Sequence, residues 1–237
     1  MERLDKVISN SGYGSRKDVK KLIKSGYVEV DGKKIKSSDI QVDVKINEIK
    51  INGEAINYRK FIYLLMNKPK GTVSATFDNY DKTVIDLLSE YHKSFEPFPV
   101  GRLDKDTVGL LILTNDGELN HKLISPKWHV DKVYYAEINR QVDEEDIYAF
   151  KEGIVLDDGY KCMPALLEVI KSDENGSSVK VTIQEGKFHQ VKRMFLSRNK
   201  EVVYLKRISF GLINLDSSLK EGEYRELNEK EIELLKW

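Results

Sequence analysis

One nine-residue segment concentrates the side chains that are best suited to chemistry. Residues 101–109, Gly-Arg-Leu-Asp-Lys-Asp-Thr-Val-Gly, hold two carboxylates and an arginine between two glycines. Glycine permits a positive φ and a close approach of the backbone, and the apolar residues 110–113 predict a buried strand behind the loop. Loops held by such strands commonly carry catalytic side chains. The segment is therefore a candidate catalytic loop, and a turn in which Arg102 pairs with a nearby carboxylate is the structural alternative.

The same segment does not resemble a metal site. Asp104 and Asp106 have no third carboxylate or histidine in register with them. The four histidines of the chain are scattered, and the one cysteine, Cys162, cannot form an internal disulfide, so we expect neither a zinc site nor a disulfide scaffold. A glycosidase-type carboxylate pair stays open, because sequence spacing does not give the separation in space that it requires.

A second candidate site is a basic helix near the N-terminus. In residues 15–24, apolar side chains recur at helical spacing, and Ser15 suits the N-cap position. Five basic residues fall largely on the opposite faces of this helix: Arg16, Lys17, Lys20, Lys21 and Lys24. This excess of basic over acidic residues favours a phosphate-binding surface, and an ordinary solvated helix face is the alternative.

The charge of the chain is unevenly distributed along its length. The 237 residues carry 39 basic and 39 acidic side chains, but residues 1–60 hold 14 basic and 9 acidic ones. Residues 61–180 hold 14 and 21, and residues 181–237 hold 11 and 9. The first sixty residues therefore form a basic module on an acidic body. With 40% apolar residues the chain can bury a core, which excludes a disordered tail protein.

Periodicity predicts an α+β protein with two domains, residues 1–60 and 61–237. Residues 1–60 should hold two short helices and a small hairpin-rich sheet, and the body should be mixed and mainly antiparallel. Strands are predicted at 27–30, 33–35, 43–46, 49–51, 61–66, 110–113, 133–138, 166–170 and 179–183. Helices are predicted at 15–24, 118–124, 143–151 and 188–198, with a terminal helix to Leu235 capped by Asn228 and Glu231.

No stretch of the sequence predicts a membrane or export segment. No apolar run approaches the roughly 20 residues that span a bilayer, and the first residues lack the apolar core of a signal peptide. We therefore expect a soluble, cytoplasmic protein without a membrane partner.

Several segments, in order along the chain, closely resemble the motifs of RNA pseudouridine synthases. They are Gly101–Gly117, Lys132-Val133-Tyr134, Glu185–Phe195, and Leu205-Lys206-Arg207 with Gly211. The first forty residues resemble the S-four RNA-binding module, with Asp31 at a position where asparagine is often seen. The resemblance covers essentially the whole chain. It implies a mixed α+β catalytic domain behind an S-four domain that binds RNA.

The resemblance implies a reaction that needs no metal and no cofactor. Asp104 would be the ionised nucleophile, which attacks either the uracil ring or the anomeric carbon of ribose. The target uridine must be flipped out, and Tyr134 would stack on it and could assist removal of the proton on carbon 5. Lys192 would keep Asp104 charged, and Arg193 is the alternative partner because one of two adjacent helical residues faces inward. Arg102 would bind the nucleotide backbone or pair with a structural acid.

The stretches 121–129, 164–170 and 222–225 are most similar to the RsuA branch of the family, which acts on small-subunit rRNA. This implies modification of 16S rRNA, most specifically at uridine 516, by a monomer that binds 16S rRNA or a small-subunit assembly intermediate. Three alternatives stay open: a synthase acting on large-subunit (23S) rRNA, a non-catalytic ribosome-assembly factor, and a small-molecule enzyme. The route of attack and the choice between free and assembling rRNA also stay open.

Overall fold

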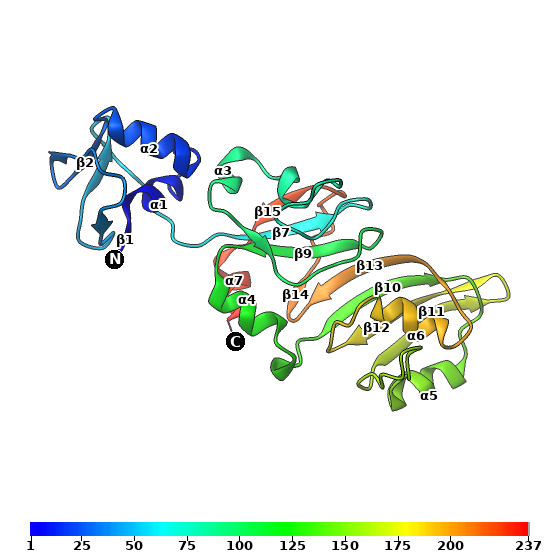
Figure 1. The fold of residues 1–237 in the computed structure, drawn as a ribbon. Coiled ribbons are helices and arrows are strands. Elements are labelled where there is room, and N and C mark those ends of the chain that lie inside the picture. The colour runs from blue at the N-terminus through cyan, green and yellow to red at the C-terminus, as the bar shows by residue number, and fades with distance from the viewer. Residues whose placement is uncertain (237) are drawn as a thin grey trace. The chain divides into compact units, whose positions relative to one another are not determined.

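The structure is a computed structural model of the chain and describes residues 1–236 (Figure 1). The chain forms two compact units. The first comprises residues 1–62 and 85–98, and the second comprises residues 63–84 and those from 99 onward. Residues 85–98 join the first unit through mutual hydrogen bonds, in which the Ser9 and Ser94 hydroxyls each donate to the other residue's carbonyl oxygen (3.2 and 3.0 Å).

The first unit contains short helices and two small sheets. Its helices are α1 (Leu4–Ser9), α2 (Arg16–Lys24), α3 (Glu90–Lys93) and the 3-10 helix η1 (Ile85–Leu87). Its strands are β1 (Glu2–Arg3), β2 (Val28–Val30), β3 (Lys33–Lys34), β4 (Gln41–Val42), β5 (Ile49–Ile51) and β6 (Glu54–Ala55). The strands pair as β1–β4 and as an antiparallel sheet in the order β3-β2-β5-β6. Apolar residues of α1, α2 and the strands form one buried cluster.

Local signals determine most of this unit. The Ser15 hydroxyl accepts a hydrogen bond from the Asp18 amide, which confirms the predicted N-cap of α2. The strand predicted at residues 43–46 is wrong, because these residues form a turn. The Asp43 carboxylate accepts from the Lys45 amide at 3.0 Å, and the Asn47 side chain accepts from the Asp43 amide at 2.8 Å. These side-chain bonds satisfy the backbone locally and compete with a strand.

The second unit is built on a large twisted sheet. Its strands are β7 (Tyr63–Lys68), β8 (Phe98–Pro99), β9 (Val108–Thr114), β10 (Lys132–Ile138), β11 (Leu166–Asp173), β12 (Gly176–Ile183), β13 (Val202–Phe210), β14 (Ile213–Asn214) and β15 (Tyr224–Glu226). The order is β11-β12-β10-β13-β9-β7-β15, with β14 on β13 and β8 on β9 (Figure 1). This confirms the predicted α+β class with a mainly antiparallel sheet. Strand β13 was not among the predicted strands.

Strands β9 and β13 form a parallel pair that joins two antiparallel parts of the sheet. Gly109 makes this contact possible. Its φ is +102°, and a Cβ at this position would lie 2.3 Å from the carbonyl oxygen of Arg207. The parallel pair brings the start of β9, and therefore the loop before it, beside β13 and β10.

Helices α4 (Gly117–Ile124), α5 (Glu144–Glu152), α6 (Gln190–Leu196) and α7 (Glu229–Leu235), with the 3-10 helix η2 (Pro126–Trp128), complete the second unit. Helices α5 and α6 contact each other through the buried rings of Phe150 and Phe195, whose centroids are 4.8 Å apart. The predicted capping box of Asn228 and Glu231 is present at α7. No helix within residues 1–236 is long and apolar enough to cross a lipid bilayer.

Candidate active site

The loop between β8 and β9 carries Asp104, and hydrogen bonds hold its backbone before and after this residue. The Ser74 hydroxyl donates to the carbonyl oxygen of Leu103 at 2.9 Å and accepts from its amide at 3.0 Å. The Thr107 amide donates to the carbonyl oxygen of Asp104 at 3.1 Å. These bonds fix the backbone on either side of Asp104, so its carboxylate is presented in one direction.

Lys68, at the end of β7, supports the same loop from inside the unit. Its side chain is fully buried, and its ammonium donates to the carbonyl oxygens of Thr107 at 2.8 Å and Lys105 at 3.4 Å. Burial lowers the pKa of Lys68 to about 8. Neither Lys68 nor Ser74 was among the candidates from the sequence. A lysine at the end of a mainly apolar strand was the available signal for Lys68.

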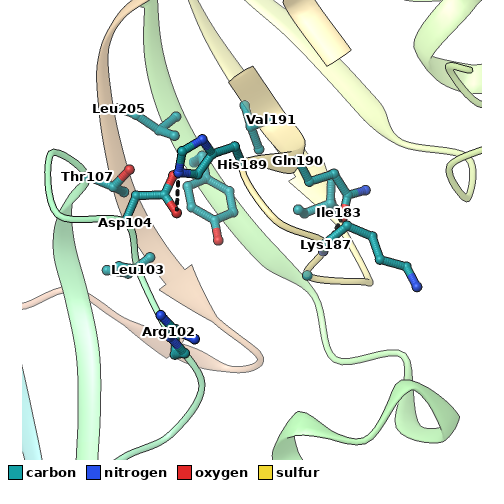
Figure 2. Close-up of a pocket in the computed structure, with 12 residues that line it drawn as sticks. Arg102, Leu103, Asp104, Thr107, Ile183, Lys187, His189, Gln190, Val191 and Leu205 are labelled. Carbon is teal, nitrogen blue, oxygen red and sulfur yellow. Dashed lines mark hydrogen bonds and ion pairs between the residues drawn. The ribbon is translucent and has the colours of Figure 1, made fainter. Parts of the chain in front are cut away.

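The Asp104 carboxylate lies beside two nitrogen-bearing side chains. Nε2 of His189 is 3.7 Å from Oδ1 (Figure 2). The ammonium of Lys192 is 3.1 Å from Oδ2. The Asp104 side chain is 26% exposed, so solvent screens this contact incompletely. A cation at this distance favours the ionised form of a carboxyl group.

Lys192 contacts both carboxylates of the loop. Its ammonium is 2.5 Å from Oδ1 of Asp106 as well as 3.1 Å from Asp104. Burial acts to lower the pKa of Lys192, but hydrogen bonds to Asp106 and Asp104 outweigh it, so the pKa is raised. Burial acts to raise the pKa of Asp106, but the hydrogen bond and charge of Lys192 outweigh it, so the pKa is lowered. Lys192 is therefore a permanent cation at this site.

Arg193, the other candidate partner of Asp104, points elsewhere. Its guanidinium forms ion pairs with Asp157 and with Asp158, the latter at 2.7 Å. Helix α6 therefore presents Lys192 to the Asp104 loop and Arg193 to the segment after α5. The sequence left this choice open, and the rotation of α6 decides it.

Tyr134 and Arg102 line the same pocket as Asp104. Tyr134 is 8% exposed, and it lies on β10 directly opposite Arg207 of β13, next to a β-bulge. The cavity has a volume of about 60 Å³. Its remaining wall comes from the loop itself, β12, the segment before α6, α6 and β13: Leu103, Thr107, Ile183, Gly186, Lys187, His189, Gln190, Val191 and Leu205 (Figure 2).

His189 reaches the pocket from a left-handed backbone conformation. Its φ is +49° and ψ is +31°, at the residue that precedes α6. Such a conformation is costly for a non-glycine residue and occurs often at functional sites. Its ring stacks on Phe188, with centroids 3.8 Å apart, and Phe188 is 75% exposed. His189 was not among the site residues predicted from the sequence, yet its Nε2 lies 3.7 Å from Oδ1 of Asp104.

The basic residues of α2 belong to the first unit, and the pocket residues belong to the second. Lys17, Lys20, Lys21 and Lys24 are exposed. Arg16 differs, because its guanidinium is 3.2 Å from the carboxylate of the fully buried Asp5. Arg16 therefore has a structural contact of its own, and Lys21 lies 3.8 Å from the Asp18 carboxylate. Lys17, Lys20 and Lys24 are the lysines of this face that form no ion pair within residues 1–236.

The described residues hold neither a metal-binding cluster nor a reactive thiol. Residues 1–236 contain no cluster of three or more histidine, cysteine or acidic side chains that could hold a metal ion. The Cys162 thiol is buried, and burial raises its pKa to about 11, which disfavours the thiolate.

Comparison with known proteins identifies the fold and the family. The sequence profile of the RNA pseudouridylate synthases matches residues 62–197, and that of the S4 domain matches residues 2–45. The chain belongs to the RNA pseudouridine synthase family. Its motif residues Asp104, Tyr134 and Lys192 come from three separate parts of the sequence, and the fold of this synthase brings them to one site.

The relatives of this pseudouridine synthase align over its whole length. An uncharacterized RNA pseudouridine synthase of Bacillus subtilis, YtzG, is 51% identical over 98% of both chains. Ribosomal small subunit pseudouridine synthase A of Haemophilus influenzae is 38% identical over 98% of this chain and 99% of its own. Ribosomal large subunit pseudouridine synthase B of B. subtilis is 37% identical over 100% and 96%. A crystal structure of a pseudouridylate synthase, 36% identical, superposes with a TM-score of 0.69 and covers 99% of this chain and 100% of the other.

Proposed function

We propose that this synthase converts a uridine of rRNA to pseudouridine with Asp104 as the catalytic carboxylate. The supporting observation is the ion pair of Asp104 with Lys192 at the edge of a pocket that Tyr134 also lines. The reaction breaks the bond between N1 of uracil and C1′ of ribose and forms a bond between C5 and C1′. The proton on C5 leaves and N1 gains one, so no oxidant or reductant is consumed.

The other pocket residues suit the remaining steps. The uridine must leave the base stack to reach Asp104, and the Tyr134 ring offers it a stacking surface. In this proposal the Tyr134 phenol also assists removal of the C5 proton. Arg102, on the rim of the pocket, binds the phosphate backbone of the flipped nucleotide.

The proposed substrate is 16S rRNA, with uridine 516 as the specific target. The similarity to small subunit pseudouridine synthase A over the full length supports this choice. Large-subunit rRNA is the second candidate, because the large subunit pseudouridine synthase B of B. subtilis is equally similar over the whole chain. An rRNA substrate implies that the protein acts in the cytoplasm, and we propose that it acts as a monomer.

Residues 1–60 act in this proposal as the RNA-binding domain and residues 61–237 as the catalytic domain. The match of residues 2–45 to the S4 domain and the exposed lysines of α2 support this division. The lysines would bind phosphates and hold the rRNA while the pocket acts on one uridine.

The deciding experiment maps pseudouridine in both ribosomal RNAs after incubation with the enzyme. Small-subunit and large-subunit rRNA are each supplied protein-free and as partly assembled particles. We expect a single new pseudouridine in small-subunit rRNA, at position 516. A product only in large-subunit rRNA would transfer the assignment to that substrate, and no product on any RNA would refute the activity.

Replacing Lys192 with glutamine should slow pseudouridine formation by about 10²-fold, because Asp104 loses the cation that lies 3.1 Å from its carboxylate. Single-turnover rates on the mapped rRNA measure this effect. The matched control is Arg193→Gln, which removes a neighbouring cation that pairs with Asp157 and Asp158 and should change the rate only a few-fold. Equal losses in the two variants would contradict the role given to Lys192.

Replacing Lys17, Lys20 and Lys24 together with glutamine should weaken rRNA binding and reduce its salt dependence. Each lost phosphate contact lowers the slope of log K against log[salt] by roughly 0.7 to 0.9, so the slope should fall by about 2. The control is the triple glutamine variant at the exposed Lys151, Lys171 and Lys180 of the second unit. An unchanged slope in the first variant would show that α2 does not bind RNA.

A further inference from the structure

A second, larger cavity lies beside the catalytic pocket. Its volume is about 400 Å³, within the range of cavities that hold a nucleotide-sized ligand. It shares Arg102, Tyr134, Gly186 and Lys187 with the catalytic pocket, so the two cavities have a common wall. Asp104 belongs to the lining of the first cavity and not of the second.

The lining of this second cavity is strongly basic. It includes Arg102, Lys132, Lys187 and Arg207, and no carboxylate among residues 1–236 forms an ion pair with any of the four. Lys192, in contrast, forms ion pairs with Asp104 and Asp106. The second cavity therefore has an excess of positive charge.

The one acidic residue of the lining, Glu185, accepts hydrogen bonds from neutral groups. The Glu185 carboxylate accepts hydrogen bonds from the Tyr160 hydroxyl at 2.7 Å, the Met163 amide at 2.9 Å and the Gln190 side-chain amide at 2.7 Å. These three donors occupy its oxygens. Glu185 therefore does not neutralise the basic side chains by direct contact.

Arg207 is the most unusual member of the lining. Its side chain is 2% exposed, Nε donates to the carbonyl oxygen of Leu110 at 2.8 Å, and Nη2 has no hydrogen-bond partner among residues 1–236. Burial lowers its pKa, and the nearby Tyr134 phenol opposes that effect. A buried guanidinium nitrogen without an acceptor is costly and rare in native proteins. An anionic ligand in the cavity that Arg207 lines would provide the missing counter-charge.

Lys132 adds a second cation that forms no ion pair within residues 1–236. Its ammonium donates to the carbonyl oxygens of Val130 at 2.8 Å and Gln184 at 3.3 Å, which are neutral acceptors. Burial, and next the charge of Arg207, lower its pKa to about 8, and the weaker opposing charges of Asp131 and Glu185 do not offset them. Both cations also contact the Phe210 ring, at 5.6 Å for Lys132 and 5.1 Å for Arg207. Keeping two cations together in this way is unfavourable unless an anion joins them.

We propose that this second cavity binds a phosphate group of the RNA strand next to the target uridine, through Lys132 and Arg207. The proposal rests on the proposed function, since the strand must lie across the common wall while its uridine occupies the catalytic pocket. Every nucleotide carries one phosphate, and arginine and lysine are its preferred partners. The bound phosphate would hold the strand in the register that presents one uridine to Asp104.

Binding of small probes to the full chain tests the phosphate site without depending on catalysis. The probes are uridine 5′-monophosphate, uridine and inorganic phosphate, with affinities measured by NMR titration. We expect the monophosphate to bind about 10-fold more tightly than uridine. Lys132→Gln should remove this difference, Lys132→Arg should keep most of it, and Lys180→Gln, an exposed lysine on β12, should have no effect.

Three results of the probe titrations would overturn the proposal. They are equal affinities of the wild type for the monophosphate and uridine, unchanged monophosphate binding in Lys132→Gln, and equal losses in Lys132→Gln and Lys132→Arg when both are folded. An RNA that contains the mapped uridine must also displace the monophosphate. Failure to displace it would assign the cavity to a free phosphorylated molecule. Pseudouridine formation on the same RNA is measured separately. A failure of the proposed activity is therefore distinguished from a failure of the phosphate site.

Discussion

Replacing Asp104 with asparagine is expected to reduce pseudouridine formation by about 10⁴-fold or more, the size of effect seen when a catalytic nucleophile is removed. The amide has nearly the shape of the carboxylate, but it carries no charge and cannot attack uracil or ribose. Quantitative pseudouridine mapping under single-turnover conditions measures the loss. Because Lys192 keeps its 2.5 Å contact with Asp106, the variant should stay folded and should bind RNA with nearly unchanged affinity.

Asp106→Asn is the matched control for this experiment. Asp106 lies two residues further along the same loop and contacts the same lysine, but its side chain is 59% exposed and it is not among the residues that line the catalytic pocket. We expect its variant to keep activity within about 10-fold of wild type. If Asp104→Asn retained full activity, or if both variants lost it equally, the assignment of Asp104 would be wrong.

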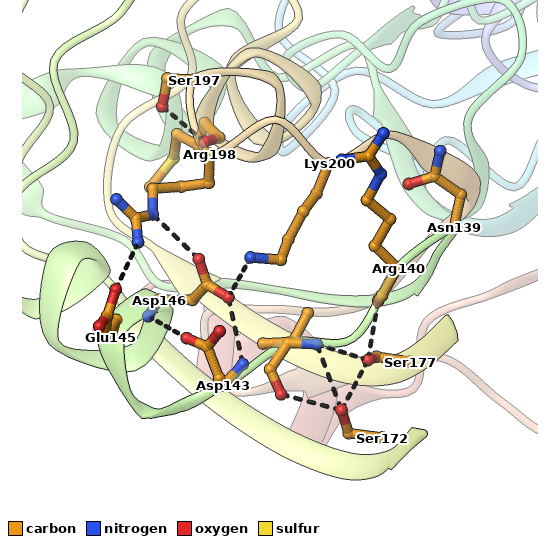
Figure 3. A network of polar contacts seen from close by, with 12 residues as sticks. Asn139, Arg140, Asp143, Glu145, Asp146, Ser172, Ser177, Ser197, Arg198 and Lys200 are labelled. Atoms are coloured by element: carbon orange, nitrogen blue, oxygen red, sulfur yellow. Dashed lines mark hydrogen bonds and ion pairs between the residues drawn. The ribbon is translucent and has the colours of Figure 1, made fainter. Parts of the chain in front are cut away.

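Replacing Asp146 with asparagine is expected to lower the free energy of unfolding of the second unit by about 3 kcal/mol. Asp146 is fully buried at the start of α5, and its oxygens lie 2.9 Å from Nε of Arg198 and 2.6 Å from the Lys200 ammonium (Figure 3). Loss of this charge leaves two cations without their shared partner. Because the Arg198 side chain is 32% exposed, water compensates part of the loss, which places the effect at the low end for a broken buried pair.

Urea denaturation of the two proteins measures this difference, with Glu145→Gln as the control. Glu145 is adjacent, is 88% exposed and lies 3.8 Å from the same arginine, so its loss should cost less than about 0.5 kcal/mol. Equal stability of Asp146→Asn and wild type would show that the network in Figure 3 does not hold α5 in place.

The contribution of Asp146 should also depend on pH. Burial acts to raise the pKa of Asp146, but hydrogen bonds from Lys200 and Arg198 outweigh it, so its pKa in the folded protein is lowered. The stabilisation is then fully present above the unfolded pKa of about 3.9 and is lost as the pH falls through the lower folded value. The stability difference between wild type and Asp146→Asn should therefore shrink below about pH 4.

Local sequence signals predicted most elements, because their determinants lie within a few residues of each other. Ser15 caps α2 and Asn228 with Glu231 caps α7, and each bond forms within one helical turn. The same reasoning failed at residues 43–46, where side chains of Asp43 and Asn47 bond to the backbone and form a turn. It also missed β13, whose pairing with β9 and β10 involves residues distant in sequence.

The sequence by itself determined the family and the α+β class, and it proposed Asp104, Tyr134 and Lys192 as the motif residues, because residue types at fixed spacing carry that information. Tertiary structure alone decided how these residues are held. The rotation of α6 selects Lys192 over Arg193 as the partner of Asp104. Such contacts depend on the packing of elements far apart in the chain, which local spacing does not encode.

The supports of the site and the second cavity belong to the same class of non-local features. Lys68 and Ser74 reach the Asp104 loop across more than 25 residues of sequence, and Arg207 is left with an unsatisfied nitrogen only because β13 packs beside β9. The sequence shows a lysine, a serine and an arginine at these positions. Their burial, and the lack of an ion-pair partner for Arg207 within residues 1–236, arise only in the folded protein. Desolvation and hydrogen-bond satisfaction are properties of the folded environment.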